Sequence, residues 1–207
     1  MEFLNNIWTA ISMPNELLIK ICLVFFTIFI EAPLSFSLIN NVFNITSSKK
    51  QKYIYVVSTA FIAIIAVFFL EWPFNIALNY ISAFIIIYFV LKMNIIKTII
   101  ASLFPSIVFN LVGNLIFNPY LHILNLTYEQ ATNTLIYRLP FALIMYLIVF
   151  LFNLVLKYKN ISINIMDNFD HKNKSMITLN FIFGFFSILI QTIITVNCSV
   201  TIDVKQK

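Results

Sequence analysis

Long stretches of apolar residues, interrupted by short polar ones, recur along the whole chain. A helix needs about 20 predominantly apolar residues to cross the ~30 Å hydrocarbon layer of a bilayer. Six stretches meet this need, at 17–39, 53–70, 72–91, 98–117, 137–156 and 176–196. The pattern predicts an all-α, polytopic integral membrane protein with six transmembrane helices.

The polar remainder is too short to fold as a separate soluble domain. Ahead of the first span, one face of a helix would collect the apolar side chains of Phe3, Leu4, Ile7, Trp8 and Ile11. Residues 1–16 are therefore expected to form an amphipathic helix in the membrane interface, ending near Pro14. The six-helix domain then occupies 17–196, and 197–207 is a polar tail.

Composition supports a membrane location. Of 207 residues, 61% are hydrophobic and 10% are charged, and the mean hydropathy is +0.94. A soluble domain is about half apolar and a quarter charged, so the lipid bilayer must cover much of this protein. The net charge of +5 comes from residues that flank the spans, which favours contact with anionic lipid. No nucleic-acid partner is expected.

Lysine residues concentrate in every second connection. Connections 40–52, 92–97 and 157–175 together carry nine Lys, whereas those on the other side carry none and the tail adds two. Short loops rich in Lys and Arg remain in the cytoplasm. The asymmetry predicts a multi-pass protein of the cell membrane with its N-terminus outside. After six crossings the C-terminus is also outside.

Glu31 is the one carboxylate deep within a predicted span. An acidic residue in this position usually faces the bundle interior or a water-filled path, and it often has a function. Two structural alternatives remain open. Glu31 can hydrogen-bond a neighbouring helix, or it can satisfy backbone groups that Pro33 leaves free. No Lys or Arg is predicted at the same depth, because Lys20 and Arg138 fall toward the outer ends.

The fourth span carries polar residues spaced four apart, which would form a ribbon winding slowly around the helix. Such side chains bond across helix interfaces or line a ligand path, and we expect Ser106, Asn110 and Asn114 to face other helices. Pro105 is expected to kink this helix. The full ribbon consists of Asn94, Thr98, Ser102, Ser106, Asn110, Asn114 and Asn118. In the second span, Ala60, Ala63 and Ala66 form a small-residue stripe expected to serve packing.

Nothing in the sequence indicates catalysis. His122 and His171 are predicted on opposite membrane faces, so they cannot share a metal or a catalytic dyad. Cys22 and Cys198 have no metal-ligand spacing. The sequence has no metalloprotease, nucleophile-elbow or phosphate-binding-loop motif. We therefore expect no enzymatic activity, cofactor or metal site on this chain.

Residues 118–136, "NPYLHILNLTYEQATNTLI", form the longest connection on the predicted outer side. This segment mixes apolar and aromatic residues and lacks Lys, so it could meet a hydrophobic peptide or settle as an ordinary loop in the headgroup region. The candidate ligand-binding residues are Tyr120, His122, Tyr128, Glu129 and Arg138.

Three stretches carry a resemblance to a known family: "LKMNIIKTIIASLFPSIVFNLVGNLIFNPYLHILNLTYEQ", "IYRLPFALIMYLIVFLF" and "LKYKNISINIMDNFDHKNKSMITLNFIFGF". In order of elements and sequence style, the chain up to about residue 196 resembles the membrane sensor region of GHKL-type peptide quorum-sensing histidine kinases, the accessory-gene-regulator kind. The resemblance implies reception of an extracellular peptide signal and two-component signal transduction by a homodimer or with a partner kinase.

In that family a further span and an ATP-binding kinase domain follow. This sequence has no phosphoacceptor-histidine helix and no nucleotide-binding motif. The resemblance therefore implies a truncated, sensor-only member. A second interpretation stays open: substrate-binding membrane subunits of energy-coupling vitamin transporters are of similar length, and Glu31 and the polar ribbon could line a vitamin site. A third is a regulatory or assembly partner without its own ligand.

Overall fold

The computed structural model of the chain describes residues 11–71 and 74–159, and every regular element in these ranges is helical. The elements are α2 (Glu16–Phe26), the π-helical segment η1 (Thr27–Glu31), α3 (Ala32–Phe43), α4 (Lys49–Phe69), α5 (Phe74–Leu91), α6 (Ile95–Leu124), α7 (Tyr128–Asn133) and α8 (Leu135–Tyr158). The all-α membrane fold is thereby confirmed for this part of the chain.

Five of these helical stretches are long and apolar enough to cross a membrane, and they match the first five predicted spans. Apolar side chains such as Phe29, Phe61 and Phe89 are more than 60% exposed on the bundle surface, as expected where lipid is the solvent. The sixth predicted span at 176–196, the tail at 197–207 and residues 1–10 of the predicted interfacial helix lie outside the described residues.

The first span is longer than predicted, because α2, η1 and α3 form one continuous stretch from Glu16 to Phe43. It begins where the Asn15 side chain accepts a hydrogen bond of 3.0 Å from the Leu18 amide, a typical N-cap. It ends where Asn44 adopts a left-handed conformation with φ 50°, which breaks the helical path. Residues 13–15 are not helical, in agreement with the break predicted at Pro14.

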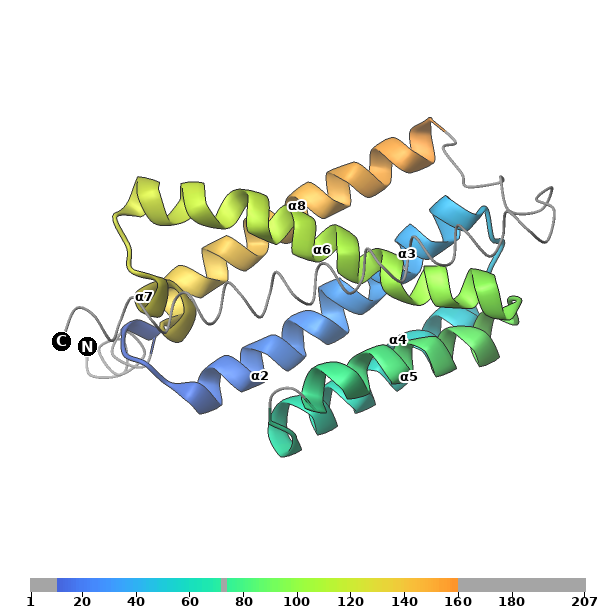
Figure 1. Cartoon of the computed structure of the whole chain (residues 1–207), viewed down its shortest axis with the longest axis horizontal. Helices are drawn as coiled ribbons and strands as arrows, with labels where there is room; N and C mark the ends of the chain where they lie inside the picture. The colour runs from blue at the N-terminus through green and yellow to red at the C-terminus, as the bar shows by residue number, and fades with distance from the viewer. Residues whose placement is uncertain (1–10, 72–73, 160–207) are drawn as a thin grey trace. The chain divides into compact units, whose positions relative to one another are not determined.

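Helices α4 and α5 lie side by side, as Figure 1 shows. Ser48 and Gln51 form a reciprocal capping box at the start of α4. The Gln51 side chain also donates a 2.8 Å hydrogen bond to the carbonyl of Val90 at the end of α5. Ala63 and Ala66 of α4 are buried, so the expected packing role of the alanine stripe is confirmed for these two residues.

The prediction that 118–136 is a loop is wrong. Helix α6 continues through Pro119 to Leu124 and ends at Asn125, which has a φ of 50°. Helix α7 then begins at a capping box formed by Thr127 and Gln130. A 30-residue helix is about 45 Å long. The apolar run marks where the ~30 Å hydrocarbon layer ends, whereas this helix extends beyond it.

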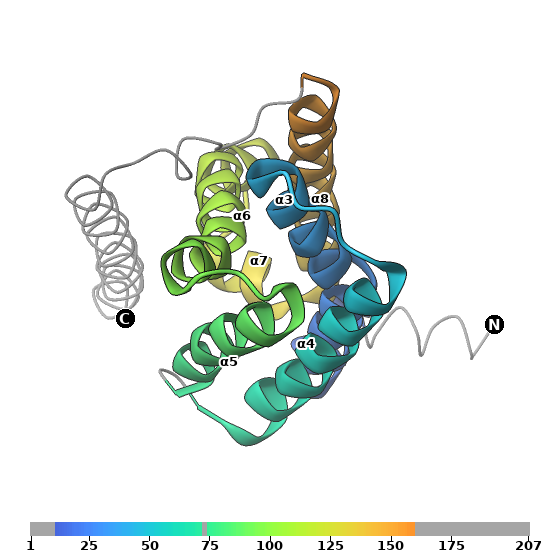
Figure 2. The same cartoon turned by 90° about the vertical axis from the view of Figure 1, so that its right-hand side faces the viewer.

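Helix α3 lies between α6 and α8 in Figure 2 and also contacts α4. Its Leu38 and Ile39 are fully buried, as are Ile100 of α6 and Val149 of α8. This core pins one half of the first span between three other helices.

The bundle has two ends that differ in charge. The connections α3–α4 and α5–α6 and the end of α8 lie together at what we call the lysine-rich end, on the right in Figure 1. The opposite, lysine-poor end holds the start of α2, helix α7 and the start of α8, and Lys20 and Arg138 are its Lys and Arg residues among those that the structure describes. The lysine-rich end carries Lys49, Lys50, Lys52, Lys92, Lys97, Lys157 and Lys159.

Candidate functional site

The π-helical segment η1 lies in the middle of the first span and ends at Glu31. Its wide turn is closed by the Ala32 amide, which donates to the Thr27 carbonyl five residues earlier. Pro33 follows directly. Proline has no amide hydrogen for the Phe29 carbonyl and its ring crowds that carbonyl, so the regular ladder must be interrupted here. Single π turns within α-helices are frequent at functional sites.

Glu31 bonds to side chains rather than to freed backbone groups. Its Oε2 atom accepts hydrogen bonds from the Thr27 hydroxyl at 3.3 Å and from the Tyr146 hydroxyl of α8 at 3.4 Å. Of the two structural alternatives from the sequence, the contact with a neighbouring helix is the one observed. Both distances exceed those of strong O–H···O bonds, so this link between η1 and α8 is weak.

Aromatic residues enclose this carboxylate. The ring of Tyr146 lies 5.8 Å from the ring of Phe26 and 5.8 Å from that of Phe109 on α6. Tyr55 of α4 is only 5% exposed and lies close enough to Glu31 for electrostatic interaction. We call Thr27, Glu31, Tyr55 and Tyr146 the Glu31 site. It joins the first span to α4 and α8 in the interior of the bundle.

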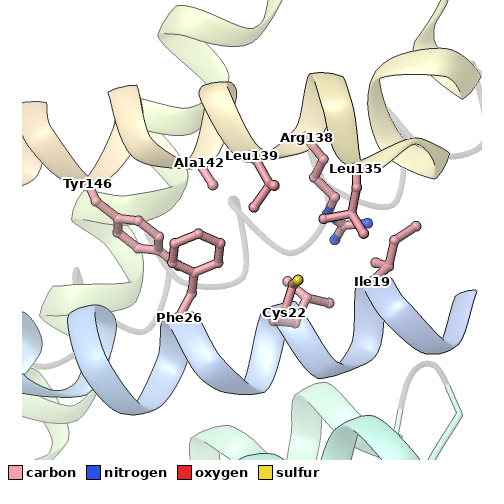
Figure 3. A pocket seen from close by; sticks show the side chains of 9 residues that line it. Ile19, Cys22, Phe26, Leu135, Arg138, Leu139, Ala142 and Tyr146 are labelled. Carbon is pink, nitrogen blue, oxygen red and sulfur yellow. The ribbon is translucent and has the colours of Figure 1, made fainter. Parts of the chain in front are cut away.

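A small cavity adjoins the Glu31 site between α2 and α8. Its volume is about 30 Å³, which in the present arrangement of α2 and α8 holds one or two water molecules. Figure 3 shows its lining side chains, with Arg138 toward one end and Tyr146 at the other. The lining consists of Ile19, Cys22, Leu23, Phe26, Leu135, Arg138, Leu139, Ala142 and Tyr146.

Tyr146, which lines the cavity, connects Arg138 to Glu31, and the sequence did not predict this connection. Tyr146 bonds the carboxylate of Glu31 and also interacts electrostatically with Arg138. Arg138 donates from Nη1 to the Thr132 carbonyl at 2.8 Å, so it also anchors the end of α7. A side chain expected at the outer rim thus lies on the same cavity as the interior site.

The polar ribbon of α6 changes its surroundings along the helix. Thr98 and Ser102 are buried, Ser106 is partly buried, and Asn110 and Asn114 are exposed among the described residues. Each step of four residues turns the ribbon by about 40°, so the four steps from Thr98 to Asn114 turn it by about 160°, from the core to nearly the opposite side of the helix. An unbroken four-residue spacing therefore cannot keep every member in an interface.

The partners of the ribbon are partly its own backbone. Ser102 donates to the Ile99 carbonyl at 2.8 Å, and Asn110 donates to the Ser106 carbonyl at 2.9 Å. The side chains of Ser106 and Asn110 also interact with Tyr80 of α5. Of the three residues expected to face other helices, Ser106 and the exposed Asn110 have an interhelical partner, whereas Asn114 is exposed and has none among the described contacts.

The candidate ligand residues of 118–136 divide into two groups. Tyr120 donates from its hydroxyl to the Tyr137 carbonyl and packs on the ring of Phe141 at 5.5 Å, so it joins α6 to α8. His122 and Glu129 are exposed, and Tyr128 is 41% exposed. The first group, Tyr120 and Arg138, stabilises the local fold. His122, Glu129 and the exposed part of Tyr128, whose ring packs on Phe117 at 5.6 Å, are accessible to a partner.

The strongest polar link between helices was not predicted. The Asn153 side chain of α8 donates to the Ser37 hydroxyl at 2.9 Å and accepts from the Asn41 amide at 2.8 Å. Asn153 and Tyr146 are seven residues apart in α8, and Val149 and Leu156 complete one buried face. This heptad spacing of polar residues within an apolar span is the signal by which both could have been found.

Among the described residues, no group of three His, Cys, Asp or Glu side chains could hold a metal ion. His171 and Cys198 lie outside these residues. The chain matches no family model, no curated protein and no solved structure. The geometry of the Glu31 site and its cavity is therefore the basis on which function is argued.

Proposed function

We propose that this bundle is the signal-receiving membrane domain of a two-component sensor histidine kinase, and that it takes up an extracellular signal and passes it to a kinase. The kinase would act in a homodimer of the sensor or as a separate partner. The observation that carries the proposal is the contact between Glu31 and Tyr146 at the π segment, because a receptor needs an internal contact that can be made or broken.

A ligand drives signalling only by binding one arrangement of the helices better than another. The two long hydrogen bonds at Glu31, 3.3 and 3.4 Å, hold the present arrangement weakly. The π turn adds a second source of change, since it holds one residue more than an α turn. Its conversion to an α turn would rotate α2 against α3 by about 100°.

The signal would be received at the lysine-poor end. There His122, Glu129 and the half-exposed Tyr128 adjoin Ile123, which is 78% exposed, and Leu124, which is 45% exposed. An apolar surface with a few polar groups suits a hydrophobic peptide. The vitamin-transporter alternative gains less support, because the cavity beside the Glu31 site is lined by neither Glu31 nor any residue of the polar ribbon.

The test is a chimera in which residues 1–196 are fused to the last span and kinase of a related sensor. Tyr146→Phe removes only the hydroxyl that reaches Glu31, so we expect it to change basal kinase output several-fold. Tyr88→Phe is the matched control, because Tyr88 is 38% exposed on α5 and packs only on Phe84 and Phe89 in the described contacts.

Conditioned medium from the source culture supplies the signal. We expect the chimera to respond and the response to fall when His122, Tyr128 and Glu129 are changed together to Ala. The sensor role is contradicted if, in a chimera that is expressed and folded, Tyr146→Phe leaves the basal kinase output unchanged and conditioned medium also leaves the output unchanged. If the response survives the triple substitution, the signal is received at a different surface of the bundle.

A further inference from the structure

Arg138 carries a positive charge that has no carboxylate partner among the described residues. The ion pair in this part of the chain joins Lys20 to Glu16 at 2.6 Å, and the recorded hydrogen bond of the Arg138 guanidinium goes to a neutral carbonyl. A guanidinium has five N–H donors. A cation within a membrane span is costly unless it pairs or reaches water, so this site favours an anion.

The cavity beside Arg138 is otherwise almost entirely apolar. Seven of its nine lining residues are Ile19, Cys22, Leu23, Leu135, Leu139, Ala142 and Phe26, and the remaining two are Arg138 and Tyr146. Arg138 and Tyr146 are eight residues apart on α8, so the lining residues are spread over about 12 Å of this helix. A cation at one end of an apolar slot matches a molecule with an anionic head and an apolar chain.

The two walls of the slot touch each other through the rings of Phe26 and Tyr146, 5.8 Å apart, and are otherwise held by different helices. Helix α8 packs mainly on α3, α6 and α7, whereas α2 packs mainly on η1 and α4. The two helices that line the cavity are therefore each held by other neighbours. A chain can enter by parting α2 from α8 without disturbing the core around α3.

We propose that the slot between α2 and α8 binds an amphiphile with one carboxylate, its head on Arg138 and its chain directed toward Phe26 and Tyr146. A length of about 12 Å corresponds to an extended chain of roughly ten carbons. Such a chain would push Tyr146 away from Glu31. Anionic amphiphiles would therefore be a class of ligand that changes the state of the sensor. That consequence rests on the proposed function, whereas binding itself is measured separately.

Cys22 lines the slot and offers a readout at the site itself. The full chain with Cys198→Ser, in nanodiscs of zwitterionic phosphatidylcholine, is treated with N-ethylmaleimide, and the alkylation rate of Cys22 is followed by mass spectrometry. We expect decanoate to slow this rate in a saturable manner and decanol, which lacks the charge, to have little effect.

Three variants connect the effect to Arg138. Arg138→Gln should weaken the decanoate effect about tenfold or more, the loss expected for a charge-assisted pair, and Arg138→Lys should retain much of it. Lys20→Gln, which removes the other cation of this end without touching the slot, should leave it unchanged. Thermal unfolding of each variant verifies folding, and Arg138→Lys keeps the test decisive if Arg138→Gln does not fold.

Equal protection by decanol, or full protection in folded Arg138→Gln, overturns the proposal. Nanodiscs with phosphatidylglycerol distinguish the second source of an anion. If phosphatidylglycerol alone protects Cys22 through Arg138 and decanoate has no effect in phosphatidylcholine, the site holds a lipid headgroup and the diffusible ligand is refuted. If decanoate protects Cys22 but leaves the chimera's kinase output flat, the site stands and the sensor function fails.

Discussion

Helix α8 meets the first span on both sides of the π segment, and the two contacts are built differently. Toward the lysine-rich end, α3 and α8 are joined by Asn153, whose two hydrogen bonds measure 2.8 and 2.9 Å. Toward the lysine-poor end, α2 and α8 enclose a cavity of about 30 Å³. The link nearest to it, between Glu31 and Tyr146, measures 3.4 Å.

The difference shows how one helix pair can be fixed at one end and adjustable at the other. Close packing around Leu38, Ile39 and Val149, which are all fully buried, leaves α3 no second arrangement at low cost. Helix α2 lacks such close packing on the side where it faces the cavity. The π segment lies at the junction, so a change on the α2 side can stop there or pass through Glu31 to α8.

The largest expected effect concerns which end faces the cytoplasm, because accessibility to a membrane-impermeant thiol reagent is all-or-none. In a background without Cys22 and Cys198, Thr46→Cys at the lysine-rich end should be labelled only from the cytoplasmic side. Asn133→Cys at the lysine-poor end should be labelled only from outside. Thr46 precedes Ser48, the N-cap of α4, and Asn133 is the last residue of α7. Neither side chain caps a helix, so the substitutions should leave the helix ends intact.

The reverse labelling pattern would invert the predicted topology and place the adjustable α2–α8 contact on the cytoplasmic side. Labelling of both positions from one side would contradict the helix order itself. The chain that lacks Cys22 and Cys198 and has no introduced cysteine, with the same reagent applied to intact cells and to inverted vesicles, supplies the background signal.

The next effect compares the stability of the two contacts. Asn153→Leu removes two interhelical hydrogen bonds and leaves Ser37 and Asn41 without their partner, so we expect a loss of roughly 1–3 kcal/mol in the free energy of unfolding. Tyr146→Phe removes one long bond and should cost about 0.5 kcal/mol or less. Unfolding by steric trapping in bicelles measures both.

Asn79→Leu is the matched control for Asn153→Leu, because Asn79 is exposed on α5 and the substitution is chemically the same. A loss in Tyr146→Phe equal to that in Asn153→Leu would mean that the two contacts are equally tight. The distinction between a fixed and an adjustable half would then be wrong.

The smallest expected effect concerns the ribbon on α6. Asn110→Leu should cost about 0.6 kcal/mol, the average of one interhelical hydrogen bond in a membrane, because its side chain interacts with Tyr80. Asn114→Leu should fall within about 0.5 kcal/mol of the wild type, because Asn114 is exposed. The same unfolding measurement decides. A larger loss in Asn114→Leu would mean that another part of the chain covers it.

The number and position of the described spans were determined by the sequence alone. A transmembrane helix satisfies its backbone within its own segment, so about 20 apolar residues suffice to predict it without knowledge of its neighbours. Helix ends are also local. Residues 118–136 carry two local signals of helix ends: Asn125, which ends α6 in a left-handed conformation, and the capping pair Thr127 and Gln130. The prediction of a loop relied on the length of the apolar run instead, and that length indicates where the lipid ends, not where the helix ends.

The partners of polar residues were decided only by the tertiary structure. Glu31 was evident as a buried acid, yet its contact with Tyr146, 115 residues away, depends on how η1 and α8 face each other. The regular ribbon of α6 misled for Asn114, because its four-residue spacing drifts around the helix, whereas Asn153 belongs to no such ribbon and bonds twice. Spacing along one helix gives the direction of a side chain, and the neighbouring helix determines whether anything meets it there.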